Sequence, residues 1–142
     1  MKVLFVCTGN TCRSPMAEVM AKNIFEGSEY RFSSAGVHAI NGDKASENAI
    51  LAAKSKDLDL RSHISRRVTY DMLEKADIII AMTSGHKEVL TTEIKTPVYT
   101  IFEYVGEKGE VIDPYGHDVE TYIDCIENLE ELLVKMYKKS KE

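Results

Sequence analysis

The chain has 142 residues, of which 44% are apolar, so it is long enough to bury one core of ordinary domain size. Its 18 basic and 23 acidic residues give a net charge of -5, which disfavours binding to nucleic acid or to an anionic membrane surface. With three cysteines, no signal-peptide pattern and no apolar run long enough to span a bilayer, we expect a reduced, cytoplasmic protein without a disulfide framework.

Short apolar runs alternate with longer segments of helical period, a pattern typical of an α/β sandwich with a parallel sheet covered on both faces. Residues 2–6 predict the first strand. Ser14 and Pro15 predict the start of the first helix, since serine is a good N-cap and proline suits the first helical position. The expected buried face of this helix consists of four apolar residues spaced by three and four: Met16, Val19, Met20 and Ile24.

The rest of the chain continues this alternation. The expected elements are a strand over 30–35 that ends at Gly36, a helix over 46–56, a short helix over 69–75, a strand over 78–82, a helix that Ser84 caps and that runs through Glu93, and a strand over 98–100. The final helix is amphipathic, with its apolar residues at Tyr122, Ile126, Leu129, Leu133 and Met136. No repeat or flexible linker interrupts the chain, which predicts one domain over 1–142.

The chemistry concentrates between the first strand and the first helix, where residues 7–15 read CTGNTCRSP. Small residues allow successive backbone N–H groups to converge, and the following helix adds unpaired donors and the positive end of its dipole. Gly9 and Asn10 are the residues best suited to the left-handed backbone that such a concavity requires. The loop therefore predicts a binding site for a tetrahedral dianion.

Cys7 and Arg13 give this loop a reactive character. The planar guanidinium of Arg13 can hold two phosphate oxygens at once. Backbone donors, the helix dipole, Arg13 and the Ser14 hydroxyl all favour the thiolate, so we expect the pKa of Cys7 to lie well below that of a free cysteine. Without its context the pair would be a buried cysteine and a surface arginine, but the strand, loop and helix around it favour a nucleophile that attacks phosphorus.

Formation of a phosphocysteine requires an acid that protonates the leaving group. Asp113 is the best candidate, because the turn sequence Asp113-Pro114-Tyr115-Gly116 can project its carboxyl group over the pocket. The same residue would activate water in the second step. The alternative is that Asp113 only stabilises the turn.

These residues resemble the low-molecular-weight protein tyrosine phosphatase family, in which a Cys-x5-Arg-Ser loop lies near the N-terminus and an Asp-Pro pair near the C-terminus. The resemblance covers essentially the whole chain. It implies a three-layer sandwich with a central four-stranded parallel sheet, and a protein phosphatase that acts through phosphocysteine. It implies Cys7 as nucleophile, Arg13 as phosphate clamp and Asp113 as acid and base. The residues implied to bind substrate or phosphate are Thr8, Gly9, Asn10, Thr11, Cys12, Arg13, Ser14 and Tyr115.

Thr11 marks the subclass. The family commonly has an apolar isoleucine or leucine at this position, whereas bacterial protein arginine phosphatases resemble this chain in having threonine. An apolar side chain suits a phenyl ring, while a hydroxyl can meet a polar, planar guanidinium. We therefore expect phosphoarginine in proteins as the substrate, with phosphotyrosine as the alternative. Tyr115 can stack on either group and does not distinguish them.

Two other functions are open on this fold. Thiol-linked arsenate reduction needs extra cysteines near the start of the fourth helix, and residues 83–93 contain none. A phosphocarrier would hold phosphocysteine without releasing it and would not depend on Asp113. Hydrolysis with release of inorganic phosphate, by a monomer acting on phosphorylated proteins, is the favoured interpretation.

The remaining candidates are assigned simpler roles. Cys12 is either a small core residue or a thiol that traps oxidised Cys7 as a reversible disulfide. Cys125 is expected to pack in the last helix. The four histidines lack metal-ligand spacing and are expected at the surface or at caps, so neither a metal nor another cofactor is predicted.

Overall fold

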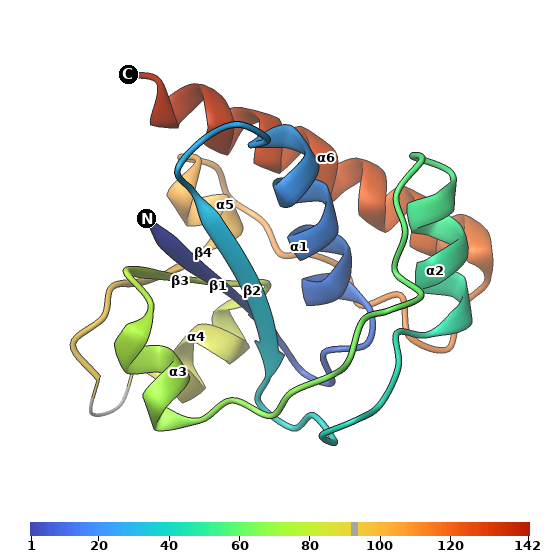
Figure 1. Cartoon of the computed structure of the whole chain (residues 1–142), viewed down its shortest axis with the longest axis horizontal. Coiled ribbons are helices and arrows are strands. Elements are labelled where there is room, and N and C mark those ends of the chain that lie inside the picture. Colours follow the sequence, from blue (N-terminus) through green and yellow to red (C-terminus); the bar gives the residue numbers. More distant parts are fainter. Residues whose placement is uncertain (92–93) are drawn as a thin grey trace.

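The structure, a computed structural model, describes residues 1–91 and 94–142, and within them four strands form one parallel sheet in the order β2-β1-β3-β4. The strands are β1 (Lys2–Cys7), β2 (Arg31–Gly36), β3 (Ile78–Ala81) and β4 (Val98–Thr100). The helices are α1 (Arg13–Ile24), α2 (Glu47–Lys54), α3 (Tyr70–Lys75), α4 (Ser84–Leu90), α5 (Ile101–Tyr104) and α6 (Val119–Ser140). The expected sheet and its flanking helices are confirmed (Figure 1).

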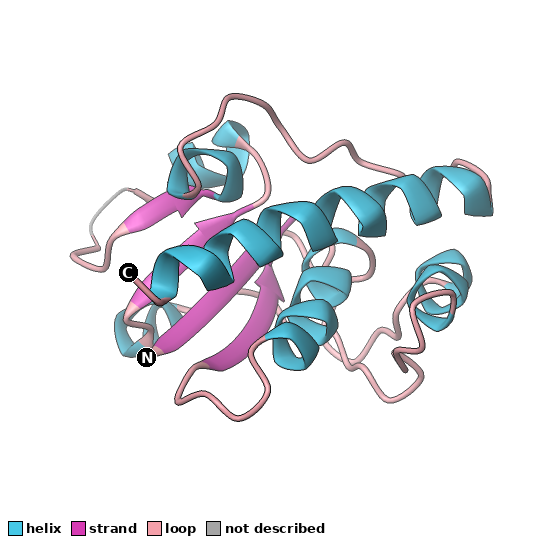
Figure 2. Cartoon of the chain, turned by 90° about the horizontal axis from the view of Figure 1, so that it is seen from above, coloured by secondary structure: helices cyan, strands magenta, loops and turns pink. Residues whose placement is uncertain are grey.

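Both faces of the sheet are buried, which explains the continuous apolar runs in the sequence. Successive residues of β1 point to opposite faces, so Phe5 lies in the core under α1 and α6 while Leu4 and Val6 lie in the core on the other face. Leu73 of α3 and Leu90 of α4 complete that second core. Figures 1 and 2 show α1 and α6 on one side of the sheet and α3 and α4 on the other.

The long helix α6 ties this arrangement together. Its N-cap, Asp118, accepts a hydrogen bond from the backbone amide of Thr121. Figure 2 shows α6 running across the sheet beside α1. The buried residues of α6 are Tyr122, Cys125, Ile126, Leu129, Leu132, Leu133 and Met136. None of the helices in the described ranges combines the length and apolarity that a bilayer crossing requires.

Two predicted helix starts are wrong. The N-cap of α1 is Cys12 and the helix begins at Arg13, so Ser14 and Pro15 lie inside its first turn. Pro15 is tolerated there because the first-turn amides have no partner within the helix. In α4 the cap is Thr83, whose side chain accepts from the His86 amide, and Ser84 is the first helical residue. The predicted end at Glu93 lies outside the described residues.

The prediction missed helix α5. It carries a capping box in which the Thr100 side chain accepts from the Glu103 backbone amide and the Glu103 carboxylate accepts from the Thr100 amide. The pattern threonine-x-x-glutamate was visible in the sequence, but the expected strand over 98–100 ends in that same threonine. Because Thr100 was assigned to the strand, it was not recognised as the N-cap of a helix.

Candidate active site

The loop between β1 and α1 encloses a cavity of about 210 Å³ at the carboxyl edge of the sheet. Eight of the ten residues that the sequence singled out line the cavity, six from this loop and two from a distant segment: Cys7, Thr8, Gly9, Thr11, Cys12, Arg13, Asp113 and Tyr115. The structure thus brings the two separated segments together. Asn10 and Ser14 lie behind the cavity wall, where both are fully buried.

Asn10 is the residue around which the loop is organised. Its φ is 55°, so it adopts the expected left-handed backbone, whereas Gly9 lies outside that region, contrary to expectation. The Asn10 side chain accepts from the Arg66 backbone amide at 2.9 Å and donates to Ser14 Oγ at 2.9 Å and to Ser34 Oγ at 3.0 Å. An asparagine therefore meets both the conformational and the hydrogen-bonding requirements of this position.

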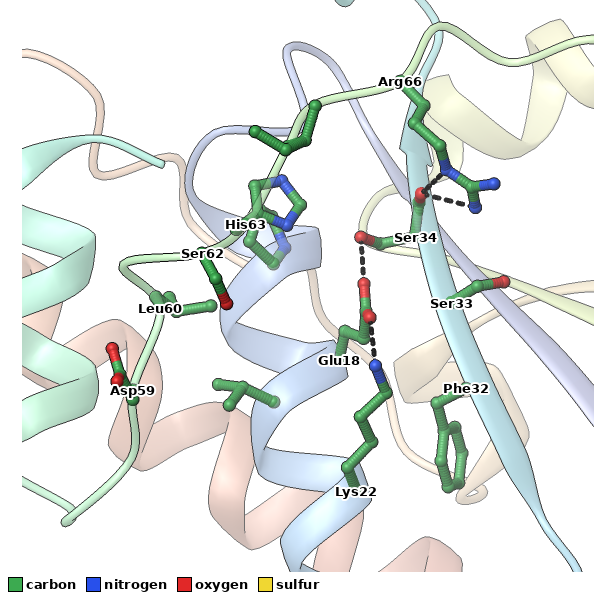
Figure 3. Close-up of a pocket in the computed structure, with 13 residues that line it drawn as sticks. Glu18, Lys22, Phe32, Ser33, Ser34, Asp59, Leu60, Ser62, His63 and Arg66 are labelled. Carbon is green, nitrogen blue, oxygen red and sulfur yellow. Dashed lines mark hydrogen bonds and ion pairs between the residues drawn. The ribbon is translucent and has the colours of Figure 1, made fainter. Parts of the chain in front are cut away.

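A larger cavity, about 420 Å³, lies behind the loop between α1, β2 and residues 59–66 (Figure 3). On its wall Ser34 donates to the Glu18 carboxylate at 2.5 Å, and Lys22 donates to the same carboxylate at 2.6 Å. Since Ser34 uses its proton on Glu18, its oxygen is left to accept from Asn10. Asn10 is therefore the donor, and Ser34 the acceptor, in the hydrogen bond that joins this cavity wall to the loop.

The Cys7 sulfur lies at the end of this series. Asn10 donates to the Ser14 oxygen, so the Ser14 hydroxyl proton is available to the Cys7 sulfur, which lies 2.8 Å away. Burial nevertheless raises the pKa of the Cys7 thiol, against the expected lowering. The Ser14 hydroxyl, the backbone amides of Ser14 and Asn10, and the Arg13 charge act in the lowering direction.

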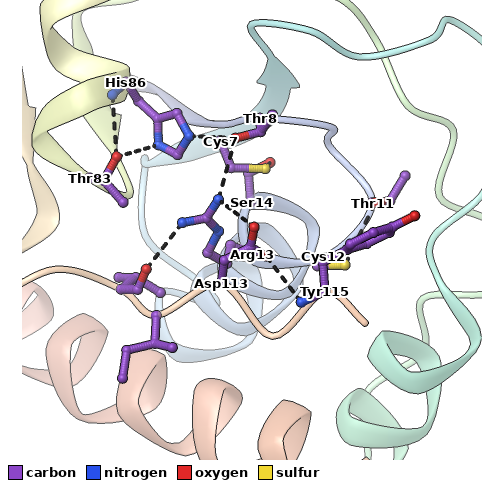
Figure 4. Close-up of polar contacts among 12 residues, drawn as sticks. Cys7, Thr8, Thr11, Cys12, Arg13, Ser14, Thr83, His86, Asp113 and Tyr115 are labelled. Carbon is purple, nitrogen blue, oxygen red and sulfur yellow. Dashed lines mark hydrogen bonds and ion pairs between the residues drawn. The ribbon is translucent and has the colours of Figure 1, made fainter. Parts of the chain in front are cut away.

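Arg13 connects the loop to the segment that carries Asp113 (Figure 4). Its guanidinium donates from Nη1 to the Val111 carbonyl at 3.1 Å and from Nη2 to Thr8 Oγ1 at 3.4 Å. Nη2 also lies 3.6 Å from Asp113 Oδ2. The guanidinium is buried, and these contacts hold it at the cavity.

The mouth of the cavity is formed by Asp113 and Tyr115. The Asp113 carboxyl group is about half exposed and accepts from the Tyr115 backbone amide at 3.1 Å, the expected turn geometry. Tyr115 is 74% exposed and lines the cavity, so its ring is accessible to a ligand. Thr11, drawn beside the Tyr115 ring in Figure 4, is half-buried.

Two histidines expected at the surface or at caps instead contact the loop. His63 Nε2 lies 2.8 Å from the Asn10 carbonyl oxygen, and His86 Nε2 lies 2.8 Å from Thr8 Oγ1. His86 follows the third strand at its carboxyl end, where the first strand also ends, and that position was a usable signal. His63 lies in an irregular segment, and the sequence carries no comparable signal for it.

The other two cysteines are buried free thiols, as is Cys7. Cys12 Sγ lies 3.5 Å from both the Tyr122 hydroxyl and Ser46 Oγ. Burial raises the pKa of Cys125 to about 12, consistent with the expected packing role. The reversible disulfide between Cys12 and Cys7 stays a prediction. Within the described ranges, no three His, Cys, Asp or Glu side chains gather as metal ligands.

Comparison with known proteins adds a family to this geometry. A family model described as low molecular weight phosphotyrosine protein phosphatase matches residues 2–142. The chain is 41% identical to a protein-arginine-phosphatase of Bacillus subtilis, over 99% of this chain and 97% of that protein. It is also 41% identical to the low molecular weight protein-tyrosine-phosphatase PtpB of Staphylococcus aureus, over 96% of each chain. A solved structure of the YwlE arginine phosphatase, a mutant with a phosphorylated active-site serine, superposes with a TM-score of 0.95 at 40% identity and covers 100% of this chain and 97% of its own.

Proposed function

The chain belongs to the low molecular weight phosphotyrosine protein phosphatase family and is a cysteine-dependent protein phosphatase, and on that premise we propose that its substrates are proteins phosphorylated on arginine. Identity does not separate the two named activities among its relatives, since both relatives share 41% of their residues with this chain. The choice therefore depends on the residues that line the cavity.

Thr11 is the observation that carries the proposal. It lines the cavity together with Tyr115, and Thr8 contributes a second hydroxyl to the lining. A guanidinium presents N–H donors in its plane, and a threonine hydroxyl can accept one of them. A phenyl ring offers no such donor and would leave the hydroxyl unpaired, which costs free energy in an enclosed site.

The proposed reaction begins with Cys7. Its sulfur attacks phosphorus, the S–P bond forms and the P–N bond to the arginine side chain breaks, while Asp113 gives its proton to the leaving nitrogen. Arg13 and the loop amides hold the phosphoryl oxygens as charge develops on them. Because burial raises the pKa of Cys7, the thiol gives its proton to a phosphoryl oxygen of the bound substrate before attack, and the Ser14 hydroxyl stabilises the resulting anion.

In the second step water attacks the phosphocysteine. The Asp113 carboxylate takes a proton from this water, the S–P bond breaks, and inorganic phosphate and the thiolate of Cys7 are the products. The contact of 3.6 Å between Arg13 and Asp113 supports this assignment, since it places the carboxyl group beside the residue that would clamp the phosphoryl group. The chemistry needs no metal or other cofactor.

We further propose that the chain works as a monomeric single domain in the cytoplasm. The family match extends over 2–142, which supports one phosphatase domain. The three free thiols support a reducing compartment. Gel filtration with light scattering tests the oligomeric state, and a second copy bound at micromolar concentration would refute it.

Turnover of matched peptides that carry either phosphoarginine or phosphotyrosine tests the substrate. We expect the wild type to prefer phosphoarginine. Thr11→Val removes only the hydroxyl and should lower kcat/KM for phosphoarginine by about tenfold, the value of one hydrogen bond, with little effect on phosphotyrosine. Thr11→Ile should in addition raise turnover of phosphotyrosine.

Thr11→Ser is the matched control, because it keeps the hydroxyl and should keep the preference. If wild type, Val and Ile variants share one substrate preference, Thr11 does not select the substrate. A wild type that prefers phosphotyrosine would contradict the proposal and support the second activity named among the relatives.

A further inference from the structure

His86 is buried on α4 next to the loop, and its ring makes hydrogen bonds on both sides. Only 7% of the residue is exposed. Its Nε2 lies 2.8 Å from Thr8 Oγ1 and its Nδ1 lies 3.0 Å from Thr83 Oγ1 (Figure 4). The reaction described above gives this histidine no part, so its burial at the loop needs its own explanation.

The contacts of Thr83 favour one position for the ring proton of His86. Thr83 Oγ1 accepts the His86 backbone N–H at 3.3 Å, as the cap of α4. Within the described residues, the acceptor in reach of the Thr83 hydroxyl proton is His86 Nδ1. This arrangement favours the tautomer in which Thr83 donates to Nδ1 and the ring proton is on Nε2, from which it is donated to Thr8.

This tautomer determines whether the Thr8 hydroxyl donates or accepts in each of its hydrogen bonds. Thr8 Oγ1 accepts from His86 Nε2 and also from Arg13 Nη2 at 3.4 Å, so both of its lone pairs have donors. Its proton is then left to donate. Thr8 lines the cavity, where an oxygen of a bound phosphoryl group would be an acceptor.

We propose that His86 is a positioning residue for phosphate binding, which orients the Thr8 hydroxyl to accept from Arg13 and to donate to a phosphoryl oxygen. This role rests on the proposed function, because it assumes that the cavity holds a phosphoryl group. In the alternative tautomer, with the proton on Nδ1, the Thr8 proton would be spent on Nε2. Thr8 would then present no donor to the ligand.

The surroundings of His86 keep its ring neutral at neutral pH. Burial, and then the charge of Arg13, lower its pKa to about 4. Two carboxylates, Asp113 and Glu110, act in the opposite direction without reversing the shift. A neutral ring has one N–H and one acceptor nitrogen, which is the state that the contacts of Thr83 and Thr8 require.

Two substitutions of His86 separate this role from simple packing. Glutamine can place an N–H near the position of Nε2, whereas asparagine reaches only as far as Nδ1. We measure the binding of inorganic phosphate to the full chain by calorimetry. His86→Asn should weaken phosphate binding by about tenfold, the value of one charge-assisted hydrogen bond, and His86→Gln should restore it to within about threefold of wild type.

A double variant tests whether His86 acts through Thr8. Thr8→Val removes the hydroxyl at nearly constant shape, so Thr8→Val/His86→Asn should bind phosphate as weakly as Thr8→Val alone. Additive losses would overturn the proposal. His38→Gln, a change to an exposed histidine, is the control and should leave the phosphate affinity unchanged.

The tautomer is measured on the wild type, so that test does not depend on a variant that folds. Nitrogen-15 chemical shifts of the His86 ring should show protonation at Nε2, and protonation at Nδ1 would overturn the proposal. Equal phosphate affinity of the Asn and Gln variants would also overturn it. Because the readout is phosphate binding, absence of phosphopeptide turnover by the wild type would refute the proposed function alone.

Discussion

At the scale of single residues, the state of Cys7 depends on enclosure and on hydrogen-bond donors that act against each other. Burial raises the pKa of the thiol, while the Ser14 hydroxyl at 2.8 Å favours the anion. The sequence predicted the donors correctly, because they belong to the loop itself. It missed the enclosure, which comes from side chains packed by distant segments.

Replacement of Ser14 tests this balance. Ser14→Ala removes the hydroxyl that stabilises the thiolate and should raise the pKa of Cys7 further, because the neutral thiol loses less than the anion. The rate of alkylation by iodoacetamide, followed against pH, should therefore rise at a higher pH in the variant than in wild type. Ser33→Ala, a change to a half-buried serine on β2, is the control. Coincident profiles of wild type and Ser14→Ala would contradict this account.

At the scale of elements, the end of β2 shapes the loop that follows β1. Gly36 pairs with Cys7 in the sheet, and a Cβ at Gly36 would lie 2.5 Å from the Thr8 carbonyl oxygen and 2.9 Å from the Asn10 nitrogen. Both atoms belong to the backbone and cannot rotate away. Gly36 thus allows the loop to lie directly against the strand.

Gly36→Ala should displace the loop and weaken phosphate binding by more than about tenfold, with a loss of about 1–3 kcal/mol of unfolding free energy from overpacking. Gly85→Ala is the matched control. A Cβ at Gly85 would lie 3.7 Å from its nearest contact, and alanine within α4 should add about 0.5–1 kcal/mol of stability. Chemical denaturation and phosphate titration measure both effects. Unchanged phosphate affinity in Gly36→Ala would show that the loop does not need the glycine.

The elements also show where prediction from sequence reached its limit. The strands were predictable because β1 and β3 are apolar on both faces, and α6 because its apolar residues repeat at helical spacing. The start of α1 was not, because Ser14 faces the Cys7 sulfur instead of capping the helix. A residue with a role in the site breaks the local rule that its type suggests.

At the scale of the whole molecule, the fold holds the acid-bearing segment against the loop by contacts from several elements. The Val111 amide donates to the Met82 carbonyl at 3.1 Å, and Asn48 of α2 donates to the His117 carbonyl at 3.2 Å. No local pattern in the sequence predicts these contacts. The turn sequence and the family resemblance predicted that Asp113 lies over the pocket, whereas the contacts of His63 and His86 with the loop were missed because they depend on tertiary packing.

The transfer of a phosphoryl group to Cys7 is the most direct test of the account. Rapid mixing with a phosphoarginine peptide, acid quenching and mass spectrometry should detect one phosphoryl group on Cys7 of the wild type. In Cys7→Ser the group should accumulate on the serine, because an alkoxide leaves phosphorus less readily than a thiolate. Release of phosphate from the peptide by the wild type, with no phosphoryl group on Cys7 at any time, would contradict the account.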